Sequence, residues 1–188
     1  LNRQGKEIMP AKYDLAGQFS SGYASVQIGQ QCGYINSSGK LSIPTRFEAC
    51  GDFLESVAPV KFNGKWGYIN PDGKQMTAFK YEDIALQFSD GLAGVMAGGK
   101  CGFVNKQGKE IIPLIYGNIA PFRNGTALVM QKQLCGFINS LGKIIIPIQY
   151  DCNCFAKDKM LITKDNLLEI SKKGKKGYID LKGTEFFE

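Results

Sequence analysis

Five copies of one ten-residue motif constrain the fold of this 188-residue chain more than any other feature. The copies are QCGYINSSGK (31–40), KWGYINPDGK (65–74), KCGFVNKQGK (100–109), LCGFINSLGK (134–143) and KKGYIDLKGT (175–184). The later glycine of the motif occurs at positions 5, 39, 73, 108, 142 and 183, so the period is about 34 residues with one insertion. Such self-similarity indicates a repeat protein, in which each unit needs its neighbours to bury its apolar face.

Each unit begins with a short aromatic and β-branched run, such as Cys32–Asn36, which is typical of a strand. A polar turn follows and closes on glycine, because a tight hairpin needs a residue with positive φ. A second apolar run then stops at a proline, which has no N–H to continue a ladder. The predicted turn glycines are Gly39, Gly73, Gly108 and Gly142, and the predicted strand-ending prolines are Pro44, Pro113 and Pro147, with Ala78 in the proline position of one unit.

A third strand in each unit alternates small and branched residues, as in Ala24, Val26 and Ile28. This period of two predicts one buried face and one wet face. An irregular connection lies before it, and residues 82–88 of that connection could hold one helical turn. Since no stretch keeps an apolar period of 3.6 for three turns, the sequence predicts an all-β fold with three strands per unit.

The residue before the first glycine of the motif is expected to face the core that neighbouring units share. It is Cys32, Trp66, Cys101 or Cys135 in the first four copies, so the position accepts very different volumes, and a free cysteine there acts as a small hydrophobe. Lys176 in the last copy suits an end unit with a wetter face. The glycines that follow are predicted to be structural repeat positions: Gly33, Gly67, Gly102, Gly136 and Gly177.

The whole chain is interpreted as a single repeat domain, 1–188. It contains a partial unit (1–30), four complete units (31–64, 65–99, 100–133 and 134–174) and a second partial unit (175–188). Both ends carry the same glycine turn and second strand, whereas a ring closed by strand exchange needs complementary ends. We therefore expect an open, elongated or superhelical stack of units, with a closed propeller-like ring as the alternative.

These motifs resemble the WG repeats, also called KWG repeats, a bacterial family of tandem β units. The family pattern is Trp-Gly-aromatic-Ile-Asn, two variable residues, Gly-Lys, an apolar run, Pro, Tyr-Asp, Phe and an Ala-x-Val strand. Residues 65–74 match its first half and residues 13–26 match its second half. The departures are cysteine in place of tryptophan, Ala78 in place of proline, and the irregular fifth unit. The resemblance implies binding or scaffold modules with no shared catalytic residues.

The residue types disfavour catalysis and metal binding. Histidine is absent from the sequence, which excludes His-dependent triads and His metal sites. Cys152 and Cys154 lack the two-residue spacing of a zinc or thioredoxin motif. Cys50 from another unit could join them, but three thiols without histidine are a weak metal site. The six cysteines are interpreted as structural thiols, with disulfides as the alternative. Four connection acids, none forming an evident catalytic pair, are Glu48, Glu55, Asp83 and Asp90.

Composition adds weak constraints on partners and compartment. The net charge of +6 is mild, and the lysine cluster in 171–177 is interpreted as a solvated hairpin end, so nucleic-acid binding is not expected. No apolar run reaches the roughly 18 residues of a membrane helix. Free thiols favour the reducing cytoplasm. Leu1 lies inside a repeat, so we expect a fragment or processed form from which an export signal could be missing.

The fifth unit carries an insertion of about seven residues around CNCFAKDKM (152–160). Insertions in repeat proteins form loops, often on the binding face, which makes Phe155, Lys157 and Lys159 candidate partner contacts. A neutral insertion in a terminal unit is the alternative.

The sequence therefore predicts a non-catalytic scaffold for protein–protein interaction, with no catalytic residue, cofactor or metal. A carbohydrate or cell-surface binding module is the first alternative. A regulatory repeat region of a larger enzyme, whose catalytic domain would lie elsewhere in the parent chain, is the second.

Overall fold

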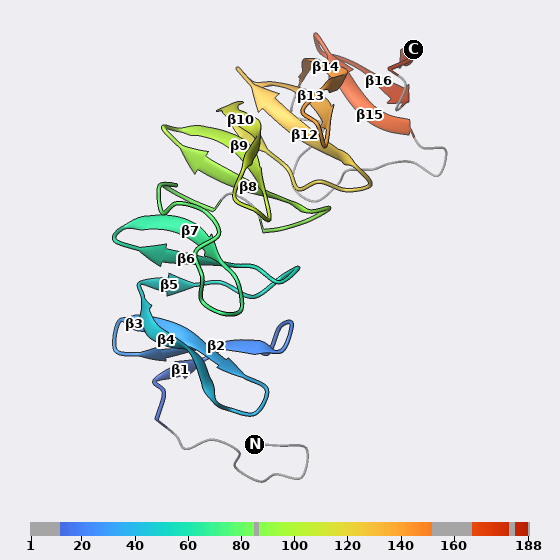
Figure 1. Ribbon diagram of the computed structural model, residues 1–188. Coiled ribbons are helices and arrows are strands. Elements are labelled where there is room, and N and C mark those ends of the chain that lie inside the picture. The colour runs from blue at the N-terminus through green and yellow to red at the C-terminus, as the bar shows by residue number, and fades with distance from the viewer. Residues whose placement is uncertain (1–11, 85–86, 152–166, 181–182, 188) are drawn as a thin grey trace.

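The computed structural model describes residues 12–84, 87–151, 167–180 and 183–187, which form five small antiparallel sheets that follow one another in a row (Figure 1). Sheet 1 contains β1 (Leu15–Ala16), β2 (Tyr23–Ile28), β3 (Gln31–Asn36) and β4 (Leu41–Phe47). Sheet 2 contains β5 (Ala49–Cys50), β6 (Ala58–Phe62) and β7 (Lys65–Ile69). Sheet 3 contains β8 (Leu92–Ala97), β9 (Lys100–Asn105) and β10 (Glu110–Tyr116). Sheet 4 contains β11 (Asn118–Ile119), β12 (Thr126–Gln131), β13 (Leu134–Asn139) and β14 (Ile144–Asp151). Sheet 5 contains β15 (Leu167–Lys172), β16 (Lys175–Asp180) and β17 (Glu185–Phe187).

The row of sheets is open and curved. Figure 1 shows sheet 1 and sheet 5 at its opposite ends, so the predicted open array of tandem β units is confirmed and the ring alternative is not adopted. The described residues contain no helix, and therefore none long and apolar enough to cross a membrane. The helical turn suggested for 82–88 is absent from the described part of that segment, where Asp83 instead forms a β-bridge with Met96.

Each sheet takes its strands from two consecutive sequence units. In sheet 1, strands β1 and β2 come from residues 1–30, whereas β3 and β4 come from residues 31–64. Sheets 1, 2 and 4 also begin with a two-residue edge strand, β1, β5 or β11, in addition to the strands that the sequence predicts. Such strands are too short to produce a detectable period of two.

The prediction that proline ends the second strand is wrong. Strand β4 continues through Pro44 to Phe47, and β10 and β14 likewise continue through Pro113 and Pro147. All three strands lie at the edge of their sheets, and each shows a register shift against its partner. Proline is tolerated at edges and bulges because no ladder bond there needs its missing N–H.

The hydrophobic core lies between successive sheets. Cores of this kind join sheets 1 and 2, 2 and 3, 3 and 4, and 4 and 5. Consequently a central sheet is covered on both faces: Ala93 and Val95 of β8 pack toward sheet 2, whereas Leu92 packs toward sheet 4. The expected wet face of the third strand is therefore absent from β8, where Leu92 through Val95 are all buried.

One aromatic contact recurs at three of these interfaces. A ring from the first strand of the motif packs in an edge-on geometry against a phenylalanine of the next sheet, at centroid distances between 4.7 and 5.0 Å. Edge-to-face pairs stabilise by about 0.5–1.5 kcal/mol beyond the burial of their area. The three pairs are Tyr34–Phe53, Tyr68–Phe88 and Phe103–Phe122.

Candidate functional site

The glycines that follow the Trp/Cys position lie where two backbones approach closely. A Cβ at Gly33 would lie 2.7 Å from the carbonyl carbon of Pro44, and one at Gly102 would lie 2.8 Å from that of Pro113. Gly136 faces the backbone of Ile148 at the same distance of 2.8 Å. Gly177, in β16, is buried and pairs with both neighbouring strands. The close approach assigns a packing role to the first three glycines.

The turn glycines adopt the positive φ that their hairpins require. Gly39, Gly73, Gly108 and Gly142 have φ values between 74° and 79°. The asparagine that begins each turn fixes it further, because its side-chain oxygen accepts two backbone N–H groups in the turn. At Asn36 these donors are Ser38 and Lys40, and Asn70, Asn105 and Asn139 repeat the arrangement.

The residue after Tyr13, Phe47, Tyr81 and Tyr150 is an acid that accepts a backbone N–H in a hairpin turn, whereas Tyr116 is followed by Gly117. Glu48 accepts the N–H of Gly64 at 3.0 Å, in the turn between β6 and β7. Asp14, Glu82 and Asp151 hold Gly29, Gly99 and Gly174 in the same way. Of the other acids that the sequence singled out, Glu55 pairs with Lys106, Asp83 accepts Ile84 N–H, and Asp90 accepts Gly125 N–H. The contacts of Glu55 and Asp90 reach residues of the following sheet, and no hydrogen bond or ion pair joins any two of these four described acids.

The variable Trp/Cys position belongs to a row of four side chains that runs across each sheet and faces the next one. We call these rows 1 to 4 after their sheets. Their members, in strand order, are Leu15, Gln27, Cys32 and Phe47 in row 1; Ala49, Lys61, Trp66 and Tyr81 in row 2; Asp83, Met96, Cys101 and Tyr116 in row 3; and Asn118, Met130, Cys135 and Tyr150 in row 4. The cysteines are buried as expected, and Trp66 is half-buried.

Row 1 contacts sheet 2 through a disulfide. Cys32 of β3 is bonded to Cys50 of β5, with a Cα–Cα distance of 6.1 Å. The interpretation of all six cysteines as free thiols is therefore wrong for these two, and Cys135 is disulfide-bonded as well. Cys101 is free and buried, and burial together with the nearby carboxylate of Asp83 raises the pKa of its thiol. These bridges remove the basis on which free thiols favoured a reducing compartment.

At the next two interfaces, the positions that correspond to Cys32 and Cys50 hold side chains that belong to one core. Between sheets 2 and 3, Trp66 packs in one core with Ile84, which stands at the position of Cys50. Between sheets 3 and 4, Cys101 packs in one core with Ile119. The two positions thus hold a disulfide at one interface, tryptophan and isoleucine at the next, and cysteine and isoleucine at the third.

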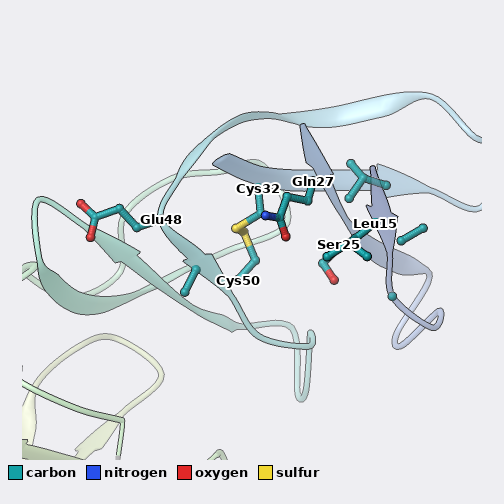
Figure 2. Close-up of a pocket in the computed structure, with 10 residues that line it drawn as sticks. Leu15, Ser25, Gln27, Cys32, Glu48 and Cys50 are labelled. Carbon is teal, nitrogen blue, oxygen red and sulfur yellow. A yellow bond between two sulfur atoms is a disulfide. The ribbon is translucent and has the colours of Figure 1, made fainter. Parts of the chain in front are cut away.

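A cavity of about 470 Å³ lies beside this disulfide, between the edges of sheets 1 and 2 (Figure 2). Strands β1 and β2 form one wall, and the disulfide with residues 48–50 forms the other. Figure 2 shows the carboxylate of Glu48 on the far side of the bridge from Leu15 and Ser25. The cavity falls within the range of roughly 300–1,000 Å³ that is usual for ligand pockets.

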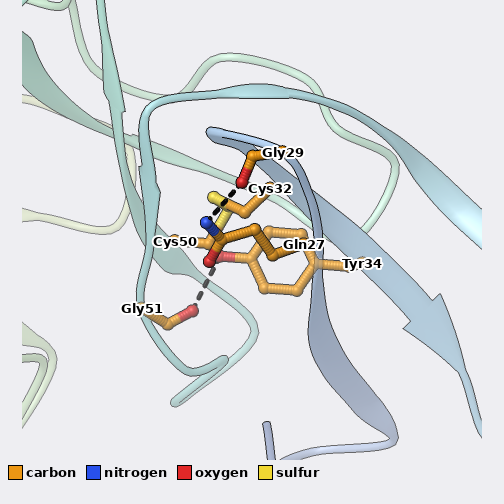
Figure 3. Close-up of a disulfide and its surroundings, with 6 residues drawn as sticks. All are labelled: Gln27, Gly29, Cys32, Tyr34, Cys50 and Gly51. Carbon is orange, nitrogen blue, oxygen red and sulfur yellow. Dashed lines mark hydrogen bonds between the residues drawn. A yellow bond between two sulfur atoms is a disulfide. The ribbon is translucent and has the colours of Figure 1, made fainter. Parts of the chain in front are cut away.

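Hydrogen bonds around the disulfide occupy the nearby polar groups (Figure 3). The Gln27 side chain donates to the Gly29 carbonyl at 2.7 Å, and the Tyr34 hydroxyl donates to the Gly51 carbonyl at 2.7 Å. Burial and then the charge of Asp52 raise the pKa of Tyr34, so this phenol stays protonated. Of the polar side chains that line the cavity, Gln27 and Glu48 are thus already engaged in hydrogen bonds.

Other candidate features give no second centre of chemistry. Phe155, Lys157 and Lys159 lie outside the described residues. Within the ranges that the structure describes, no three His, Cys, Asp or Glu side chains are grouped as metal ligands would be. The lysine cluster of 171–177 forms the β15–β16 hairpin, and Lys172 pairs with Glu185 at 3.0 Å. A smaller hollow of about 170 Å³ on sheet 5 is lined by Tyr178 and Phe186, among others.

Sequence reasoning missed the cavity and most of its lining. The signal was present in part: when the units are aligned, only the unit containing Cys32 also carries cysteine at the position occupied elsewhere by Ile84 and Ile119. Gln27 could not be found in that way, because its place beside Cys32 depends on the strand register.

Comparison with known proteins identifies the family of the repeat. The model of the WG containing repeat matches residues 1–32, 33–66, 66–101, 102–135 and 136–151. A search of curated proteins finds no match. Among solved structures, the chain is similar to an eukaryotic initiation factor, with 11% identity and a TM-score of 0.53 over 94% of this chain and 53% of that one. It is also similar to Kluyveromyces marxianus Hsv2, with 11% identity and a TM-score of 0.50 over 90% of this chain and 60% of that one.

At such identities the likeness concerns the fold alone, and the chain spans less than two thirds of either structure. The family match is different in kind, because it follows the repeats one after another over most of the sequence. The chain belongs to the WG containing repeat family.

Proposed function

We propose that this chain is a non-catalytic scaffold that binds a protein partner along the surface of its stacked sheets. The observation that carries the proposal is the burial of the recurring rings: Tyr34, Tyr68, Phe103 and Phe137 are each 1% exposed. Rings that are enclosed between sheets cannot act as stacking platforms for sugars. Among the described residues, the exposed aromatic rings are Phe19, Tyr178 and Phe186, which belong to sheets 1 and 5.

The repeated polar groups support the same proposal, because their contacts serve the fold. The turn asparagines and the clamping acids are engaged by backbone N–H groups of hairpin turns. What remains for recognition is an extended surface with short backbone edges at β1, β5 and β11. Edges of this kind can accept an added strand from a partner, with neighbouring pockets supplying specificity.

The test begins with capture of partners from an extract of the source cell by the full chain, followed by purification of the captured protein. We expect the purified partner to bind with a measurable heat in calorimetry, and to slow hydrogen exchange on at least two neighbouring sheets. A glycan array run in parallel serves as the contrast. Saturable glycan binding without binding of any purified protein would overturn the proposal.

A further inference from the structure

Row 1, beside the cavity, has a different pair of central side chains from the other rows. Row 2 has Trp66. Rows 3 and 4 have cysteine at that position, but place Met96 and Met130 on the adjacent strand, where both pack against the core between sheets. Row 1 has cysteine beside Gln27, whose amide is directed to the Gly29 carbonyl.

The next interface shows which group fits this space. Trp66 occupies the position of Cys32, and its indole packs in one core with Ile84, at the position of Cys50. Because the same register relates both rows to their sheets, the cavity lies where an indole would be if sheet 1 carried tryptophan. The fold itself therefore provides a template for an aromatic occupant.

The walls of the cavity carry apolar side chains and sulfur, which suit an aromatic ring. Leu15 and Ala49 are the apolar members of rows 1 and 2 in the lining, and the disulfide adds a polarisable surface. Sulfur next to an aromatic ring is a favourable contact. Glu48, the charged member of the lining, already accepts the Gly64 N–H at 3.0 Å.

The cavity also borders a strand edge that no other described strand pairs with. Strand β1 is the outer strand of sheet 1, and its Leu15 is 64% exposed at the cavity wall. An extended partner segment that runs along this edge could direct every second side chain toward the cavity. A single ring would then anchor the segment, as aromatic side chains often do at interfaces.

We propose that this cavity binds an aromatic side chain, tryptophan above all, presented by an extended segment of a protein partner. The site deepens the proposed scaffold function and rests on it. Its own test uses a small probe, so that the two ideas can fail separately.

The probe is N-acetyl-tryptophanamide, and its binding is followed by saturation-transfer NMR on the full chain. Because one side chain supplies few contacts, we expect a dissociation constant on the order of 1 mM. Two variants fill the cavity from within by copying other rows. Cys32→Trp/Cys50→Ile reproduces the Trp66–Ile84 pair, and Gln27→Met reproduces the cysteine–methionine neighbours of rows 3 and 4.

Both filling variants should weaken probe binding by at least about tenfold. The matched control is Lys61→Met, which makes the same kind of change in row 2, where Trp66 is already present, and should leave binding within about twofold. If the double variant does not fold, Gln27→Met decides the question without disturbing the disulfide.

Absence of probe binding at about 5 mM, or equal binding to Gln27→Met and the wild type, would overturn this site. In either case, binding of a purified partner protein to the full chain would still support the scaffold function. Probe binding that both filling variants abolish, together with failure to find any protein partner, would support the site and contradict the scaffold.

Discussion

Gly33 and Pro44 face each other across the β3–β4 pair so closely that a Cβ on the glycine would lie 2.7 Å from the carbonyl carbon of the proline. The bulge that brings the proline strand inward is the reason, since the register shifts between Cys32 and Tyr34. Sheets 3 and 4 repeat this approach at Gly102 and Gly136. The glycine of the repeat is therefore required by the close approach of the proline-containing strand.

Gly33→Ala should lower the free energy of unfolding by about 1–3 kcal/mol, because the new methyl group meets backbone that cannot move aside. Chemical denaturation followed by circular dichroism measures the change. Gly117→Ala is the matched control: its Cβ would meet only the Met130 carbonyl oxygen, at 3.7 Å, and its φ is not in the left-handed region. An equal loss of stability in both variants would contradict the close approach.

Gly67→Ala should be less destabilising than Gly33→Ala, by roughly 1 kcal/mol. In sheet 2 Ala78 replaces the proline, and the nearest obstacle is the Phe79 side chain at 2.6 Å, which can rotate. The same denaturation experiment gives the comparison. If Gly67→Ala were the more damaging change, the proline bulge would not be the origin of the constraint.

Removal of the Cys32–Cys50 bridge with Cys32→Ala/Cys50→Ala should lower stability by about 3 kcal/mol. The bridge spans a sequence separation of 18 and joins sheet 1 to sheet 2. Urea denaturation is the measurement, and Cys101→Ala, which removes a buried free thiol, is the control at about 1 kcal/mol. A double variant no less stable than the control would argue against a stabilising bridge.

Glu48→Ala should destabilise the β6–β7 hairpin by about 0.5–1.5 kcal/mol, because the Gly64 N–H loses its acceptor. Glu48→Gln keeps one acceptor oxygen and should lose less. Hydrogen exchange at the Gly64 amide provides the local readout. Unchanged protection of this amide in Glu48→Ala would show that the acid does not clamp the turn.

Stability should decline in acid partly through Glu185. Hydrogen bonds from Tyr150 and then Lys172 lower the pKa of this carboxyl below its ordinary value of 4.5. A group with a depressed folded-state pKa stabilises above its unfolded-state value, and this contribution is lost as the pH falls through the folded-state pKa. Glu185→Gln should therefore flatten the acid limb of a plot of unfolding free energy against pH.

Equal slopes in the wild type and Glu185→Gln would contradict a role for the Tyr150–Glu185 contact.

Much of the architecture could be predicted because the same pattern recurs in successive units of the chain. The glycine turns and the apolar alternation at Ala24 and Val26 were sufficient to predict strands and stacking. The continuation of β4 through Pro44 was not predictable in the same way, because the local rule against proline in a ladder does not apply at an edge bulge.

The size of the cavity depends on the side-chain volumes of residues that lie side by side on neighbouring strands. The neighbour of the cysteine is Gln27 in row 1 and Met96 in row 3, and these neighbours cannot be assigned from the sequence until the strand register is known. The Cys32–Cys50 bridge was within reach of an alignment of units, whereas the cavity wall from β1 needed the folded sheet.

The central claim is that the units bury their rings only by stacking on one another. Nuclear Overhauser effects between ring protons test it most directly, at Tyr34–Phe53, Tyr68–Phe88 and Phe103–Phe122, whose centroids lie 4.8, 5.0 and 4.7 Å apart. The stacked array predicts a cross-peak for each of the three pairs. Their absence from a folded sample, with the rings accessible to a soluble paramagnetic probe, would contradict it.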